Sequence, residues 1–175
     1  SDVFDARSTL SEIFGDSVPG IITKIETSKS LRNLKGLARV SDALMVARGD
    51  LGLTTPIQDL PLWQEKIIHT CHLMDTPVIV ATQFLENFAD TGLPNRAEIS
   101  DVQLAVNQNA NGIMLSRETS GSKDPIGVLQ FAISIVNSAQ QNSSRRNMKL
   151  LRTKHPILAI EGADGVGKTS VAKAL

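Results

Sequence analysis

The chain has 175 residues, of which 41% are hydrophobic, and its 18 basic residues balance its 18 acidic residues. This composition excludes an intrinsically disordered chain, and the zero net charge excludes an overall attraction to nucleic acid or anionic lipid. The single cysteine excludes an internal disulfide and no apolar run approaches the roughly 20 residues of a membrane span, so we predict a cytoplasmic protein.

A first helix is predicted at the N-terminus, because apolar residues recur there at the spacing of one helix face. They are Val3, Ala6, Leu10, Ile13 and Phe14. Turn-forming residues between positions 15 and 20 end the pattern. The sequence opens on this helix without an initiator methionine and stops at Leu175, and we expect both ends to be truncations of a longer protein.

Strands and helices are predicted to alternate over most of the chain. Short apolar runs predict strands at residues 21–26, 43–47, 78–82 and 112–116. Helical periodicity predicts helices at residues 30–38, 60–73, 97–107 and 125–139, the last begun by Asp124 and Pro125. This alternation indicates right-handed βαβ units and a parallel sheet, either doubly wound or part of a (β/α)8 barrel, and periodicity does not choose between them.

The character of the chain changes near residue 140. Residues 141–155 carry several basic side chains and no acidic one, which is typical of a linker whose charges are solvated rather than bound to nucleic acid. An apolar strand at residues 157–160 then leads into a glycine-rich loop. We therefore predict an α/β domain at residues 1–140, a basic linker at 141–155 and the start of a second domain at 156–175.

Polar side chains follow the predicted strands where each one ends. They are Lys24, Glu26, Asp50, Thr82, Ser116 and Glu118. Active sites of α/β sheets and barrels form at this carboxyl edge, and the i, i+2 spacing points Lys24 and Glu26 to the same face. Two carboxylates can hold Mg2+, and a nearby lysine can stabilise a phosphoryl group during transfer. Ordinary salt bridges at a barrel mouth are the alternative, and the pattern leaves it open.

Longer motifs around these residues resemble those of the pyruvate kinase family. Residues 22–26 read Ile-Thr-Lys-Ile-Glu and residues 45–52 read Met-Val-Ala-Arg-Gly-Asp-Leu-Gly. Further motifs follow in the family's order at residues 77–86, 95–102 and 113–119. The resemblance covers residues 1–140 and implies the second half of the catalytic barrel, a partial (β/α)8 TIM barrel of four βα units. One departure is Arg117, where the family usually has glycine.

The resemblance implies a role for each residue in transfer between phosphoenolpyruvate and ADP, giving pyruvate and ATP. Lys24 would stabilise the phosphoryl group, Glu26 and Asp50 would bind Mg2+ or Mn2+, and Ser116 with Glu118 would relay a proton to the enolate. The implied substrate-binding residues are Lys24, Arg48, Gly49, Asp50 and Thr82, with Thr82 also catalytic. The family also uses K+, whose site lies mostly in earlier strands outside this sequence, and its full-length members are expected to be homo-oligomers.

A second signature follows the linker. Residues 162–169 read Gly-Ala-Asp-Gly-Val-Gly-Lys-Thr, a complete phosphate-loop (P-loop) pattern between a predicted strand and a predicted helix. Backbone amides of such a loop cradle phosphates, its lysine reaches the terminal phosphates and its threonine can bind Mg2+. Residues 160–170 resemble the start of thymidylate kinase. The predicted nucleotide-binding residues are Gly162, Asp164, Gly165, Gly167, Lys168, Thr169 and Ser170.

These motifs lead to one functional hypothesis and two alternatives. The first is a pyruvate kinase-like phosphotransferase fragment, inactive alone. The second is a fusion with a nucleoside monophosphate kinase whose body lies beyond Leu175, and the third is a non-catalytic half-barrel module. His69, Cys71 and His72 do not converge on one helix face, so we predict a structural role for them rather than a metal site.

Overall fold

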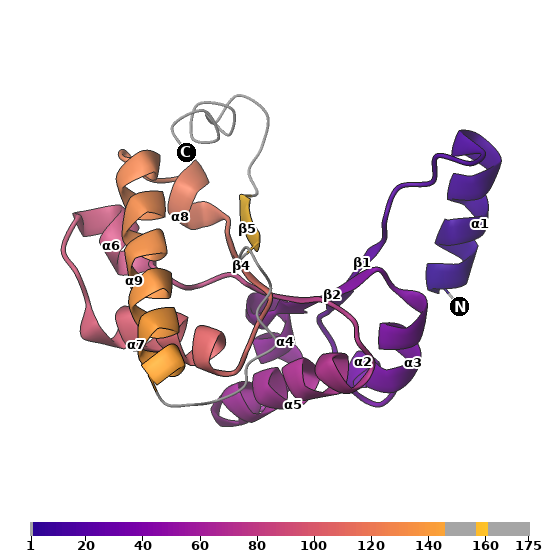
Figure 1. Ribbon diagram of the computed structural model, residues 1–175, viewed down its shortest axis with the longest axis horizontal. Helices are drawn as coiled ribbons and strands as arrows, with labels where there is room; N and C mark the ends of the chain where they lie inside the picture. The colour runs from indigo at the N-terminus through magenta and orange to yellow at the C-terminus, as the bar shows by residue number, and fades with distance from the viewer. Residues whose placement is uncertain (1, 146–156, 161–175) are drawn as a thin grey trace. The chain divides into compact units, whose positions relative to one another are not determined.

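The computed structural model describes residues 2–145 and 157–160, in which strands and helices alternate (Figure 1). It forms two compact units, Ser1–Ile79 and Val80–Leu175, and strand β3 contributes residues to both. The strands follow one another in the order β1-β2-β3-β4-β5, which is also their order along the chain. An α/β fold with parallel strands is therefore confirmed. None of the described helices is long and apolar enough to cross a membrane.

The first unit is built on two parallel strands, β1 (Ile22–Ile25) and β2 (Ala43–Ala47), paired from Ile22 opposite Ala43 to Ile25 opposite Val46. The N–H of Leu44 donates to the carbonyl of Pro77, just before β3 (Val78–Ala81), at 2.9 Å. All five residues of β2 are buried, as expected for a parallel strand covered on both faces. The helices of the first unit are α1 (Asp2–Phe14), α2 (Ser28–Leu31), α3 (Leu34–Val40), α4 (Arg48–Thr54) and α5 (Leu60–Leu73), with a 3-10 turn at Ile57–Asp59.

Helix α1 contacts the rest of the first unit through α3 and through the side chain of Arg7. It packs on α3, and Arg7 donates to the carbonyl of Val40 at 3.1 Å and to Asp42 at 2.8 Å. Asp42 also accepts the N–H of Ile21 at 2.6 Å, and these bonds lower the pKa of its carboxyl. The continuous apolar face predicted for α1 is only partly buried: Val3 is covered, whereas Ile13 and Phe14 are exposed. Helix α3, with seven residues, is too short to cover the whole length of the 13-residue helix α1.

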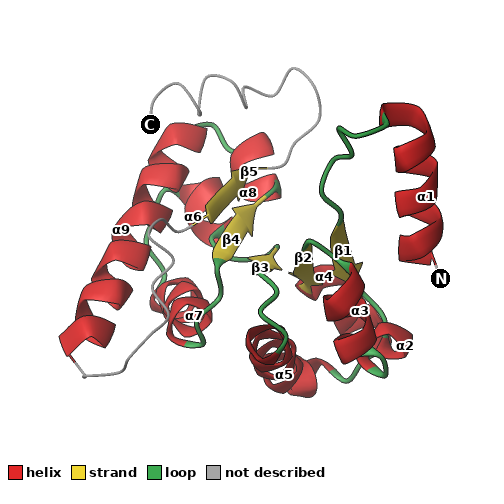
Figure 2. Cartoon of the chain, turned by 45° about the vertical axis from the view of Figure 1, so that its right-hand side comes forward, coloured by secondary structure: helices red, strands yellow, loops and turns green. Residues whose placement is uncertain are grey.

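The second unit is built on β4 (Gly112–Leu115) and β5 (Ile157–Ile160), which pair in parallel from Gly112 opposite Ile157 to Leu115 opposite Ile160 (Figure 2). The N–H of Thr82, directly after β3, donates to the carbonyl of Met114 at 3.4 Å. Around these strands lie α6 (Glu86–Thr91), α7 (Arg96–Asn107), α8 (Arg117–Ser120) and α9 (Pro125–Arg145). Helices α7 and α9 pack side by side (Figure 1).

Helix α9 begins as predicted but ends later. The Asp124 carboxylate accepts the N–H of Gly127 at 2.9 Å, which satisfies one of the amides that a helix start leaves without an internal partner. The helix then runs to Arg145, beyond the predicted end at residue 139, because no glycine or proline interrupts the intervening sequence. It therefore extends into the predicted linker.

Two other local predictions differ from the structure. The single helix predicted at residues 30–38 is two short helices, and Thr27 and Ser30 begin the first with a reciprocal capping box. Residues 48–52, whose Arg-Gly-Asp-Leu-Gly sequence predicts a turn, form most of helix α4, since nothing in that sequence forbids helical backbone once it follows a buried strand. The predicted P-loop at residues 162–169 lies outside the described residues.

Candidate functional site

The first unit contains five of the predicted site residues. Two of them form an ion pair at the end of β1. The ammonium of Lys24 lies 2.5 Å from a carboxylate oxygen of Glu26. The prediction that this i, i+2 pair shares one face is therefore confirmed. Both side chains reach solvent, with 53% of Lys24 and 35% of Glu26 exposed, so the pair is accessible to a ligand.

Helix α4 brings the next group of predicted residues to the end of β1. Arg48, Gly49 and Asp50 form its first turn, where helix amides point out of the N-terminal end. Further along, the Thr54 hydroxyl donates to the carbonyl of Glu26 at 3.1 Å. Residues four apart share a helix face, so Asp50 lies on the face of α4 that Thr54 presents to Glu26. Arg48 is buried, whereas Asp50 is exposed.

This donor set is compatible with magnesium. Mg2+ keeps several water ligands and is bound through one or two carboxylates together with substrate oxygens, so Glu26 and Asp50 are the right donors in the right number. Within the described residues, no group of three or more His, Cys, Asp or Glu side chains could hold a metal ion.

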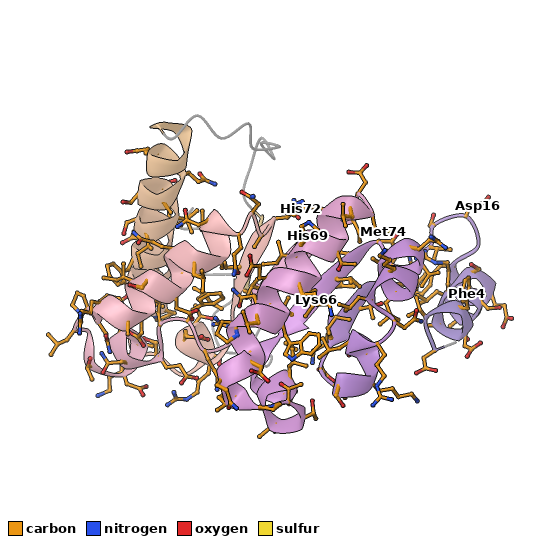
Figure 3. The ribbon with its side chains drawn as sticks, turned by 90° about the horizontal axis from the view of Figure 1, so that it is seen from below. Phe4, Asp16, Lys66, His69, His72 and Met74 are labelled. Carbon is orange, nitrogen blue, oxygen red and sulfur yellow. The ribbon has the colours of Figure 1, made fainter. Side chains whose placement is uncertain are left out.

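The histidines of helix α5 lie apart from this arrangement. Figure 3 shows His69 and His72 on that helix. Cys71, between them, is fully buried, whereas His69 is exposed, so the three side chains do not share a face. Burial raises the pKa of the Cys71 thiol to about 12, which keeps the thiol protonated and unreactive at neutral pH.

The second unit contains Thr82, Ser116 and Glu118. Thr82 follows β3 and has a left-handed backbone, with φ at +71°, and Gln83 has φ at +58°. Ser116 follows β4 and begins helix α8. Glu118 is 1% exposed, and its two carboxylate oxygens accept the N–H of Phe84 at 2.8 Å and the N–H of Ser116 at 2.9 Å.

Two features of this unit escaped the sequence analysis. The left-handed conformation of Thr82 and Gln83 has no signal in the sequence, since glycine and asparagine are the residues that normally mark it. Arg117 pairs with Asp90 on α6, with both carboxylate oxygens 3.3 Å from one guanidinium nitrogen. The pairing joins residues 27 apart, so no spacing rule could have found it. It directs the large side chain of Arg117 toward α6.

Comparisons with family models and with known proteins point to the same family. A family model described as the barrel domain of pyruvate kinase matches residues 1–128. The chain is 43% identical over 123 residues to the chloroplastic pyruvate kinase isozyme G of Ricinus communis, covering 70% of this chain and 29% of that protein. It is 37% identical over 140 residues to the pyruvate kinase of Thermotoga maritima, covering 80% of this chain and 30% of that protein.

The fold agrees with a solved relative. A crystal structure of a pyruvate kinase from Cryptosporidium parvum matches with a TM-score of 0.76 and 33% sequence identity, over 80% of this chain and 29% of that one. The chain thus spans about 30% of the length of these relatives.

Proposed function

Because the chain belongs to the pyruvate kinase family through its barrel domain, we propose that it carries phosphoryl-transfer and metal-binding residues of that enzyme. The reaction is transfer between phosphoenolpyruvate and ADP, giving pyruvate and ATP. The observation that carries the proposal is the exposed Lys24–Glu26 pair at the end of β1, beside the helix that bears Asp50. The family match ends at residue 128, so the proposal concerns the first part of the chain.

Lys24 is proposed to stabilise the phosphoryl group as it moves. Phosphoryl transfer needs positioning and charge stabilisation more than covalent help, and a fixed ammonium supplies both. The Lys24–Glu26 contact of 2.5 Å holds the ammonium at the strand end, while the 53% exposure of Lys24 leaves it open to a phosphate. The ordinary salt-bridge alternative accounts for the contact but predicts no ligand there.

Glu26 and Asp50 are proposed to hold Mg2+, or Mn2+ in its place. When bound, the ion would neutralise charge on the phosphate oxygens. The bond from Thr54 to the carbonyl of Glu26 supports the assignment, because it keeps the Asp50 face of α4 against the end of β1. The backbone amides of Gly49 and Asp50, with Arg48 preceding them, are proposed to take the carboxylate of phosphoenolpyruvate, since the start of a helix favours negative charge.

The resemblance also implies roles for two residues of the second unit. Thr82 would contact substrate and Ser116 would lie on the path of the proton to the enolate. The resemblance implies a part in this relay for Glu118 as well, whose carboxylate accepts the N–H of Ser116. ADP and the K+ ion would depend chiefly on parts of the family's barrel that this sequence does not contain.

Mn2+ binding tests the metal assignment without requiring turnover. The chain would be titrated with Mn2+ and the free ion followed by electron paramagnetic resonance, comparing wild type with Glu26→Gln and Asp50→Asn. Each substitution should weaken binding by roughly tenfold or more, because each removes one of two anionic ligands. Asp16→Asn is the matched control, since Asp16 is an exposed carboxylate of the same unit in the loop after α1 (Figure 3). Equal affinity in all four proteins would refute the proposed site.

The chain alone is proposed to have negligible pyruvate kinase activity and marginal stability. Its described strands run in an open order with β1 and β5 at the two ends, whereas a barrel must close strand on strand. Open edges also favour aggregation. Turnover of phosphoenolpyruvate and ADP by the purified chain, abolished by Lys24→Ala, would contradict this proposal and exclude the non-catalytic module as well.

A second candidate function is nucleotide binding by a P-loop resembling that of thymidylate kinase. The observation in its favour is the parallel pairing of β5 with β4, with Ile160 opposite Leu115. The strand that leads into the P-loop signature thus joins a sheet, as such a loop requires. Titration with ATP and Mg2+, with Lys168→Ala as the comparison, should detect only weak binding. Sub-micromolar affinity lost in Lys168→Ala would instead make a nucleoside monophosphate kinase the first candidate.

A further inference from the structure

Glu118 is the most deeply buried acidic side chain among the described residues, with 1% of its surface exposed. It lies in the first turn of α8, three residues after β4 ends at Leu115. One carboxylate oxygen accepts the N–H of Phe84 at 2.8 Å and the other accepts the N–H of Ser116 at 2.9 Å. A single carboxylate therefore ties the segment that follows β3 to the segment that follows β4.

The segment after β3 needs such support, because its backbone conformation is energetically unfavourable. Thr82 and Gln83 have φ at +71° and +58°, a region that residues with a Cβ seldom adopt and that is least favourable for a β-branched side chain such as threonine. A conformation of this kind persists only where its surroundings determine it. The N–H of Thr82 is held by the carbonyl of Met114, and the N–H of Phe84, two residues later, is held by Glu118.

The geometry of Glu118 suits a structural role. Each of its carboxylate oxygens accepts one backbone N–H, and the side chain is closed to solvent. Bonds from backbone amides to a carboxylate are among the stronger hydrogen bonds in proteins, which suits a role in fixing backbone.

We propose that Glu118 is a positioning residue, which holds the left-handed turn at Thr82 and Gln83 and the backbone of Ser116 through its two amide bonds. The conformational part of this inference stands on the contacts alone. Its consequence for catalysis, namely that Glu118 places Thr82 and Ser116 for substrate, rests on the proposed function.

Nuclear magnetic resonance of the full chain tests the conformational part directly. A positive φ brings the amide proton close to the Hα of the same residue and gives a strong intraresidue cross-peak. Wild type should show this signature at Thr82 and Gln83, and Glu118→Gln should lose it, because the NH2 group that replaces one carboxylate oxygen cannot accept the N–H which that oxygen held. Hydrogen exchange at Phe84 and Ser116 should become roughly ten- to a hundredfold faster.

Glu98→Gln is the matched control. The Glu98 carboxylate also accepts two backbone amides in the same unit, those of Asn87 at 2.6 Å and Phe88 at 3.3 Å, but it does not contact the Thr82 turn. This variant should speed exchange at its own two amides and keep the signature at Thr82. If a folded Glu118→Gln protein keeps the signature and the slow exchange, the proposal is wrong.

A measurement on wild type covers the case in which Glu118→Gln does not fold. Scalar coupling across the hydrogen bonds should connect the amide nitrogens of Phe84 and Ser116 to the carboxyl carbon of Glu118. Absence of both couplings, or of the positive-φ signature, would overturn the proposal. None of these readouts requires turnover, so a failure of the proposed function would leave the result intact, and the reverse also holds.

Discussion

Thr82 offers a stability measurement at a residue proposed to contact substrate. Its φ of +71° costs an ordinary L-residue about 1–2 kcal/mol, whereas glycine adopts that conformation without the cost. Thr82→Ala and Thr82→Gly both remove the hydroxyl and methyl groups, but only glycine also removes the Cβ that causes the strain. Glycine loses about 0.5–1 kcal/mol relative to alanine through its greater freedom in the unfolded chain. The balance predicts that Thr82→Gly is more stable than Thr82→Ala by roughly 0.5–1 kcal/mol.

Urea unfolding of the two variants measures this difference. The control is the same pair of substitutions at Ser100, an exposed residue in the middle of α7 in the same unit. There glycine should be less stable than alanine by about 1 kcal/mol, because the backbone is helical. The difference in the free energy of unfolding between the glycine and alanine variants should therefore have opposite signs at positions 82 and 100. If glycine is the less stable residue at both positions, the strain assigned to Thr82 does not exist in solution.

Two further predictions concern ionisable groups of the first unit. The bonds from Ile21 and Arg7 lower the pKa of folded Asp42, so its stabilising effect is present above the unfolded pKa of about 4 and is lost as pH falls through the lower folded value. Thermal unfolding between about pH 2 and 7 should therefore show a steeper loss of stability for wild type than for Asp42→Asn, and equal slopes would contradict this. Burial of Cys71 raises the pKa of its thiol to about 12, so a thiol reagent at neutral pH should label the chain only after unfolding. Rapid labelling of the folded chain would show that the thiol is accessible.

Several elements were predictable because their signals are local. Strand Ala43–Ala47 was predicted to the residue, since a continuous apolar run follows polar residues and stops at Arg48. Helix Leu60–Leu73 was predicted equally well from its apolar spacing. The common face of Lys24 and Glu26 followed from strand geometry alone. These cases share a pattern in which neighbouring residues along the chain decide the outcome.

The remainder depended on contacts between distant residues. The left-handed turn at Thr82 needs the bond between Phe84 and Glu118, which joins residues 34 apart. The exposure of Ile13 depends on how much of α1 is covered by α3. The residue type alone did not reveal that the Glu118 carboxylate accepts the amides of Phe84 and Ser116. That Glu26 and Asp50 lie close enough together to bind one metal ion stays a prediction.

Turnover by a chimera tests most directly whether Lys24 takes part in phosphoryl transfer. Residues 1–128 of this chain would replace the matching segment of the Thermotoga maritima relative, and transfer between phosphoenolpyruvate and ADP would be measured with and without Lys24→Ala. We expect the folded chimera to be active and Lys24→Ala to abolish its turnover while leaving it folded, since the ion pair between Lys24 and Glu26 contributes at most about 1 kcal/mol to stability. Undiminished turnover in the Lys24→Ala chimera would contradict the claim that this segment supplies the phosphoryl-transfer residue.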